Sequence, residues 1–112
     1  MISNIGLTRE RNLIMADIVK LKAGTGTSPP SGMDSSLETE IAEVDAGVET
    51  VAASKFRISG RLNSATANGS TLQEVGATCA DGLYDRLIVL PVAKSNDIEI
   101  EYEITIERRN KT

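Results

Sequence analysis

The sequence has no histidine and a single cysteine, and both shortages restrict the chemistry that the chain can perform. Without histidine, neither a Ser-His-Asp nor a Cys-His arrangement can form, and zinc loses its usual nitrogen ligand. Cys79 has no second cysteine for an internal disulfide, which fits a chain made in the cytosol. Its apolar surroundings favour a buried structural thiol over a nucleophile. We therefore expect no catalytic residue, no metal site and no cofactor.

Aromatic residues are also scarce, at 3% of the chain: Phe56, Tyr84 and Tyr102, with no tryptophan. The core must therefore be built from aliphatic side chains. Sugar-binding surfaces usually stack on exposed aromatic rings. A carbohydrate-binding module, which would have to rely on Tyr84 and Tyr102, remains an alternative of another functional class.

Long apolar runs and excess positive charge are absent as well. No run approaches the ~20 residues of a membrane span, and residues 1–7 lack the basic start and continuous apolar region of a signal peptide. The net charge of −4 over 112 residues disfavours binding to nucleic acid and to anionic membranes. We expect one domain, made in the cytoplasm, with neither nucleic acid nor membrane as a partner.

Carboxylates are plentiful, but their spacing favours structural roles. Glu99, Glu101 and Glu103 share one face of an expected strand, and Asp81 and Asp85 flank an expected hairpin. Glycoside hydrolysis needs two carboxylates across a cleft, so we expect a solvated face or charge pairing with a neighbouring subunit. No segment has the ligand spacing of a calcium loop. An enzyme based on Asp81 and Asp85 is the least favoured alternative.

The first half of the chain combines helical and extended patterns. Residues 8–15 are rich in helix formers and predict a short helix, and the alternation of residues 18–23 predicts a strand. Residues 24–32 hold glycines, prolines and hydroxyl residues, which predicts a loop; the loop lacks the Gly-Lys-Ser/Thr ending of a phosphate-binding loop. Ser35 and Glu38 form a capping box ahead of apolar residues at helical spacing, which predicts a second helix over residues 36–44.

The second half reads as strands separated by turns. The clearest is the last, where four isoleucines and Tyr102 alternate with mostly acidic residues, so that one face is apolar. The expected strands cover residues 50–62, 72–79, 83–92 and 98–107. The sequence therefore predicts a mainly β protein, an antiparallel β-sandwich-like domain with one or two short helices near the N-terminus. Residues 1–112 form one domain, with residues 1–17 a helical arm and residues 18–108 a β-rich body.

Several glycines are expected at turns or close approaches. Asn68-Gly69 and Asp81-Gly82 are hairpin signals, and Gly76 inside a strand indicates a bulge or a close approach of the backbone. Glu74 is expected to hold a loop amide or to pair with Arg86 across adjacent strands. The structural glycines are Gly24, Gly26, Gly69, Gly76 and Gly82.

Three pieces of the chain, taken in order, resemble a family of small tailed-bacteriophage virion proteins found among tail and fibre-associated components. The first is the GTGTSPP segment starting at Gly24, followed by Asp34, Leu37 and Glu40. The second is NGSTLQEVG over residues 68–76, and the third runs from Leu83 and Arg86 to PVAK over residues 91–94. The resemblance implies a β-sandwich-like structural protein with no catalytic residues.

We therefore expect a non-enzymatic virion protein, made in the host cytoplasm and present in many copies in the tail, collar or fibre-attachment region. It would assemble with copies of itself, as a homo-oligomer, and with other virion proteins. A capsid decoration protein that clamps the head lattice is the alternative. The candidate interface residues are Leu7, Leu13, Ile14, Thr25, Thr27, Pro29, Pro30 and Met33.

Overall fold

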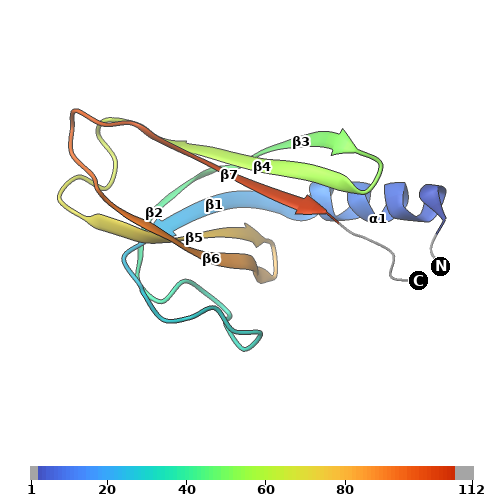
Figure 1. Ribbon diagram of the computed structural model, residues 1–112, viewed down its shortest axis with the longest axis horizontal. Coiled ribbons are helices and arrows are strands. Elements are labelled where there is room, and N and C mark those ends of the chain that lie inside the picture. Colours follow the sequence, from blue (N-terminus) through green and yellow to red (C-terminus); the bar gives the residue numbers. More distant parts are fainter. Residues whose placement is uncertain (1–2, 108–112) are drawn as a thin grey trace.

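The chain folds into two antiparallel sheets that pack face to face, with one helix at the N-terminus (Figure 1). We describe residues 3–107 from a computed structural model. The first sheet has the order β2-β1-β5-β6 and the second the order β3-β4-β7. The strands are β1 (Ile18–Gly24), β2 (Glu40–Asp45), β3 (Gly47–Ala52), β4 (Lys55–Leu62), β5 (Thr71–Cys79), β6 (Gly82–Ala93) and β7 (Ile100–Glu107). The predicted mainly β, sandwich-like fold is confirmed.

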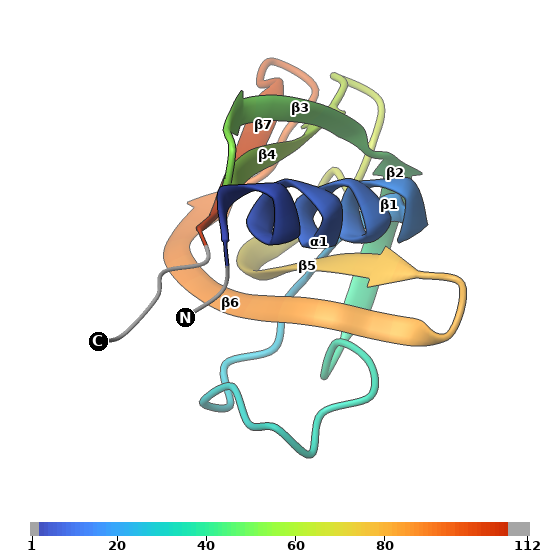
Figure 2. The same cartoon turned by 90° about the vertical axis from the view of Figure 1, so that its right-hand side faces the viewer.

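The helix α1 (Asn4–Asp17) is longer than the predicted helix over residues 8–15. It begins at a Ser3 cap, whose hydroxyl oxygen accepts a hydrogen bond from the Gly6 amide at 3.1 Å. It ends where Ile18 turns extended and enters β1. Figure 2 shows α1 across one end of the sandwich, between β3 and β4 on one side and β5 and β6 on the other. Its Ile14 and Met15 pack against the core.

The predicted helix over residues 36–44 is wrong. The capping-box residues lie in a loop, and the chain then forms β2. Ala42 is buried and Val44 half-buried, whereas Ile41 and Glu43 between them are exposed, which is a period of two. Leu37, Ile41 and Val44 match a helical period as well, and pairing with β1 decided between the two patterns.

The predicted single strand over residues 50–62 is a hairpin. Residues 53–54 form a turn between β3 and β4, which pair with each other. β2 and β3 are separated only by Ala46, so the chain passes there from one sheet to the other. The strand predicted from residue 98 begins two residues later, at Ile100.

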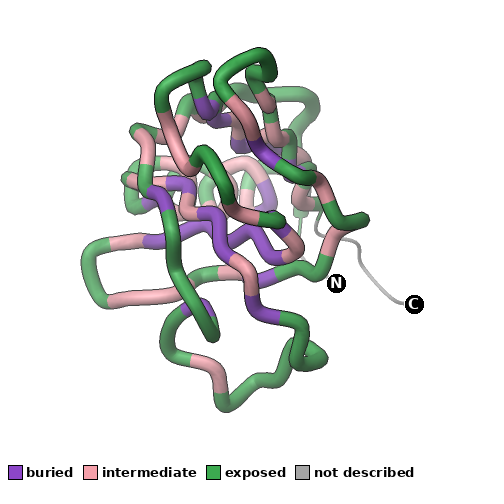
Figure 3. Tube along the Cα trace, turned by 90° about the vertical axis from the view of Figure 1, so that its left-hand side faces the viewer, coloured by how far each residue is buried: buried purple, intermediate pink, exposed green. Residues whose placement is uncertain are grey.

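The core lies between the sheets and is largely aliphatic. Ile104 of the last strand is buried, and Tyr102 and Ile106 pack against the same cluster, so the apolar face of β7 does point inward. Figure 3 shows the buried segments gathered in the middle of the molecule and the loops exposed around them. The fully buried side chains of the core include Leu21, Phe56, Ile58, Leu62 and Leu72.

The acidic face of β7 is balanced within the chain by basic residues of β4. Arg61 pairs with Glu101 at 3.2 Å, and Arg57 approaches Glu103 at 3.8 Å. Lys55 and Glu107 lie opposite each other in the register, with their charged groups 3.8 Å apart. β1 and β2 carry a similar set, in which Lys20 pairs with Asp45 and Lys22 with Glu40. Both outer faces therefore carry cross-strand ion pairs, which suit contact with water.

Candidate functional site

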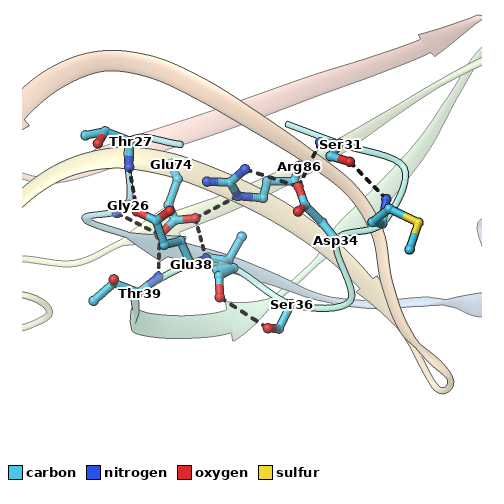
Figure 4. Close-up of polar contacts among 11 residues, drawn as sticks. Gly26, Thr27, Ser31, Asp34, Ser36, Glu38, Thr39, Glu74 and Arg86 are labelled. Carbon is cyan, nitrogen blue, oxygen red and sulfur yellow. Dashed lines mark hydrogen bonds and ion pairs between the residues drawn. The ribbon is translucent and has the colours of Figure 1, made fainter. Parts of the chain in front are cut away.

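A buried carboxylate, Glu74 on β5, is the centre of the most organised polar cluster in the described chain. Val75 and Ala77 of the same strand belong to the core, and alternation along the strand points Glu74 to the opposite face. The loop formed by residues 25–39 covers that face and leaves Glu74 with no exposed surface. Figure 4 shows the carboxylate surrounded by this loop.

Each oxygen of the Glu74 carboxylate accepts two hydrogen bonds. Oε2 accepts from the amides of Gly26 at 2.7 Å and Thr39 at 2.8 Å. Oε1 accepts from the Glu38 amide and from Arg86 Nε, both at 2.9 Å. One side chain therefore holds both ends of the loop against the sheet. Since all four acceptor positions of the carboxylate are filled, the geometry suits an anchor.

Arg86, on the neighbouring strand β6, supplies the balancing charge. Its side chain is 3% exposed, and its Nη1 donates to Asp34 Oδ2 at 3.2 Å, in the middle of the loop. Asp34 Oδ2 also accepts from the Ser31 amide at 2.9 Å. Arg86 Nη2 is buried and has no hydrogen-bond partner among the described residues. The ion pair thus links β5, β6 and the loop.

The same contacts set the protonation of the pair. Burial by itself raises the pKa of Glu74, but the hydrogen bonds from Thr39, Arg86, Glu38 and Gly26 outweigh it. They hold the pKa of Glu74 below its ordinary value of 4.5. The hydrogen bond to Glu74 raises the pKa of Arg86, so both groups stay charged in the folded state.

We expect a specific pH dependence from this cluster. Because the pKa of Glu74 is lower when folded than when unfolded, its stabilising contribution is full above 4.5 and is lost as the pH falls through the folded pKa. Urea unfolding of the wild type between about pH 5 and pH 3 should show falling stability. Glu74→Gln lacks this carboxyl, so its free energy of unfolding should fall less steeply between about pH 5 and pH 3 than that of the wild type. Parallel curves for the two proteins would mean that Glu74 titrates as it does in the unfolded chain.

Two glycines of the first motif let the loop approach the carboxylate. A Cβ on Gly24 would lie 2.7 Å from Glu74 Oε2 and 2.9 Å from the carbonyl carbon of Thr39. A Cβ on Gly26 would lie 2.8 Å from the carboxyl carbon of Glu74. Gly76 is also closely approached, since a Cβ there would meet Leu37 Cδ2 at 2.8 Å. The predicted link between Glu74, a loop amide and Arg86 is therefore confirmed, and these glycines make room for it.

A second buried cation, Lys94, anchors the turn after β4. Its side chain is almost fully buried, and its Nζ donates to Asn68 Oδ1 and to the Ser95 carbonyl oxygen, both at 2.9 Å. The backbone of Lys94 also pairs with Gly69 and Ser70. Gly69 and Gly82 have positive φ angles of 87° and 131°, which fit their turn positions.

The candidate interface residues fall into two groups. Leu7 is buried and Ile14 packs against the core, so both already have partners inside the chain. Thr25 is half-buried and its amide donates to the Thr39 carbonyl oxygen at 3.0 Å. The exposed ones are Leu13, Thr27, Pro29, Pro30 and Met33.

Three residues of the structure were not identified from the sequence as site residues: Asp34, Lys94 and Leu90. Asp34 and Lys94 stand in these motifs, but nothing in their spacing indicated that Asp34 contacts Arg86 or that Lys94 is buried. Leu90 is 86% exposed beside Pro91 on β6, and a proline inside an apolar strand is the signal for an edge or a bend.

The surface formed by residues 3–107 is hollowed near these elements. Two shallow hollows, of about 390 Å3 and 360 Å3, share Asp34 and Arg86 as lining residues. A third, of about 250 Å3, lies where α1 meets the ends of β6 and β7, and its lining includes Leu7, Ile14, Phe56, Tyr84 and Ile106. Within residues 3–107, no three His, Cys, Asp or Glu side chains gather as metal ligands. In the same residues, no helix has the length and apolar character to cross a membrane.

Comparisons with protein-family models, with curated proteins and with solved structures gave no match to this chain.

Proposed function

We propose that this chain is a non-enzymatic structural protein of a tailed-phage particle that works by assembling with copies of itself and with other virion proteins. The observation that carries the proposal is the loop of residues 25–39. Long loops without secondary structure are usually functional in compact domains. This one is held in a single shape by a fully buried ion pair.

A loop fixed in this way is suited to present side chains to a protein partner. A surface that is ordered before binding loses less conformational entropy when it binds. The loop carries Met33, 90% exposed, together with Pro29 and Pro30. Leu90 is presented in a similar way, four residues before the anchored Lys94. The hydrogen-bonded carboxylate and the exposed aliphatic side chains together support a binding role.

The position in the particle is part of the proposal. The resemblance of the three sequence segments to tail and fibre-associated proteins favours the tail, collar or fibre-attachment region, and a capsid decoration protein is the second candidate. A carbohydrate-binding module has less support, because Tyr102 packs in the core and leaves Tyr84, 37% exposed, as the one accessible tyrosine of the described chain.

Mass spectrometry of purified particles that carry the gene tests the proposal. We expect the chain in the particle at a fixed copy number, in the hundreds for a decoration protein and far lower for a tail component. In parallel, Met33→Asp should leave the unfolding free energy of the purified chain unchanged, because Met33 is exposed, and should lower its incorporation into particles. Absence of the wild-type chain from the particles would overturn the proposal.

A further inference from the structure

β6 differs from the other three border strands of the two sheets. β2, β3 and β7 are also at sheet edges, and each carries acidic side chains paired with a neighbouring strand, as in Asp45 with Lys20, Glu49 with Arg57, and Glu101 with Arg61. Charged residues at an edge discourage pairing with another chain. β6 has only Asp85 and the buried Arg86 as charged residues along its 12 positions. Of the four edges, β6 is the one least protected by charge.

The free edge of β6 is also apolar. Tyr84, Leu87 and Ile88 are 37%, 39% and 39% exposed, and Leu90 is 86% exposed. No described strand pairs with β6 beyond β5, and Figure 2 shows β6 as the outer border of its sheet. An edge with these side chains is a ready template for a second strand.

Irregular pairing limits where such a strand can bind. The register with β5 shifts at Tyr84 and again between Ile88 and Val92. The regular stretch is therefore residues 85–88, and Pro91 has no backbone N–H to offer. The two irregular regions leave Tyr84 at one end of the stretch and Leu90 at the other.

These two ends differ in shape. Tyr84 borders the hollow of about 250 Å3, whose lining combines the apolar Leu7, Ile14, Phe56 and Ile106 with four polar or charged residues and is mostly apolar in surface. That volume is below the roughly 300–1,000 Å3 of sites for drug-sized ligands, and it suits a single aliphatic side chain. At the other end, Leu90 projects into solvent. The edge therefore has a surface hollow at its Tyr84 end and an exposed apolar side chain, Leu90, at its other end.

We propose that two copies of the chain form a symmetric dimer by pairing their β6 strands antiparallel, with the two-fold axis at Leu87. This deepens the proposed function by naming the first contact between copies. Leu87 is three residues from both Tyr84 and Leu90, so the axis brings Leu90 of each copy to the end of the paired strands where Tyr84 of the other copy lies. Each Leu90 then lies at the mouth of the partner copy's hollow.

The charge pattern disfavours two neighbouring registers and allows this one. With the axis at Leu87, Arg86 faces Ile88 and Asp85 faces Val89, so that no charged residue meets one of the same sign. An axis at Arg86 would place the two arginines opposite each other, and an axis at Asp85 would do the same for the two aspartates, which is unfavourable. The proposed occupant is a second copy, because one and the same edge carries the exposed Leu90 and the hollow that can receive it.

Cross-linking tests the register. In a Cys79→Ser background, Leu87→Cys should give a disulfide-linked dimer under mild oxidation, because residues facing each other across antiparallel strands have Cα atoms about 4.5–5.5 Å apart. Asp85→Cys is the matched control. It faces Val89 of the other copy and lies about 13 Å along the strand from its own equivalent, so it should not cross-link. Cross-linking of both variants alike, or of neither, would overturn the proposed register.

Sedimentation velocity tests the contribution of Leu90. Leu90→Asp should raise the dissociation constant of the dimer by about tenfold or more. Val51→Asp, at a 41% exposed position on the β3 edge, should leave it unchanged. A wild-type chain that is monomeric at all concentrations overturns the dimer, and its presence in particles would still support the proposed function. A wild-type dimer unaffected by Leu90→Asp overturns the β6 contact alone.

Discussion

Glu74→Gln should lower the free energy of unfolding by about 3–5 kcal/mol, the usual effect of removing one partner of a buried ion pair. The glutamine amide group would have to face two N–H donors in either orientation, because both carboxylate oxygens accept from two donors. In either orientation Arg86 would lose the carboxylate charge beside it and would remain buried with Asp34 as its charged partner. Since small domains have about 5–15 kcal/mol in total, this is a large part of the stability.

Urea unfolding measures this loss, and Glu101→Gln provides the control. Glu101 is a β-strand glutamate paired with an arginine at 3.2 Å, but both partners are about half exposed. Exposed pairs contribute about 0–1 kcal/mol, so the control should stay close to the wild type. Equal effects at the two positions would mean that burial of Glu74 adds nothing to its contribution.

A double-mutant cycle with Arg86→Met separates the ion pair from the loop contacts. The single Arg86 variant keeps the three amide bonds to Glu74, and the double variant leaves neither a carboxylate at position 74 nor a guanidinium at position 86 to be buried unbalanced. We therefore expect the double variant to lose less than the sum of the two single variants, by about 1–3 kcal/mol. Additive losses would show that the two side chains act independently.

The parts of this fold that the sequence predicts well are those where one physical signal dominates. The last strand is an example, because Ile100, Tyr102, Ile104 and Ile106 alternate without interruption and only a half-buried strand satisfies that period. Glu74 is another, since a carboxylate in a strand that also carries Leu72 and Val75 needs donors when it is buried.

The predictions that failed had two competing signals. Residues 35–45 contain both a capping box and an apolar period of two, and the pairing of Ala42 and Val44 with β1 decided for a strand. Residues 50–62 alternate across the position of a turn, and nothing in Ala52, Ala53 and Ser54 marks it as strongly as an Asn-Gly pair would.

The site was predictable in its centre and not at its periphery. Glu74 and Arg86 lie on strands that follow one another, so their contact follows from a hairpin. Asp34 reaches Arg86 only because residues 25–39 fold back over the sheet, which no local pattern encodes. Leu90 lies where the register with β5 shifts, and no local sequence pattern marks the position of that shift.

Gly24→Ala should be the second most damaging of the substitutions considered. A Cβ at this position would lie 2.9 Å from the carbonyl carbon of Thr39, whose carbonyl oxygen accepts from the Thr25 amide, and 2.7 Å from Glu74 Oε2. Both neighbours are fixed by hydrogen bonds, so neither can move aside cheaply. Overpacking of this kind costs about 1–3 kcal/mol or more, which lowers Tm by roughly 4–8 °C per kcal/mol in a domain of this size.

Gly32→Ala is the matched control for this prediction, because it lies in the same loop and a Cβ there would have no atom within 4 Å. It should be neutral or should stabilise by about 0.4–1 kcal/mol, through the lower entropy of the unfolded chain. Hydrogen exchange provides a local measurement. In Gly24→Ala, the amides of Gly26, Glu38 and Thr39 should lose their protection against exchange before the amides of the core strands do. The reason is that these three amides donate to Glu74 only while the loop is closed over it. The prediction is contradicted if both alanine variants unfold at the wild-type temperature with those amides still protected. In that case the close approach at Gly24 does not hold the loop in place. The buried carboxylate then tolerates a looser fit than its four hydrogen bonds indicate.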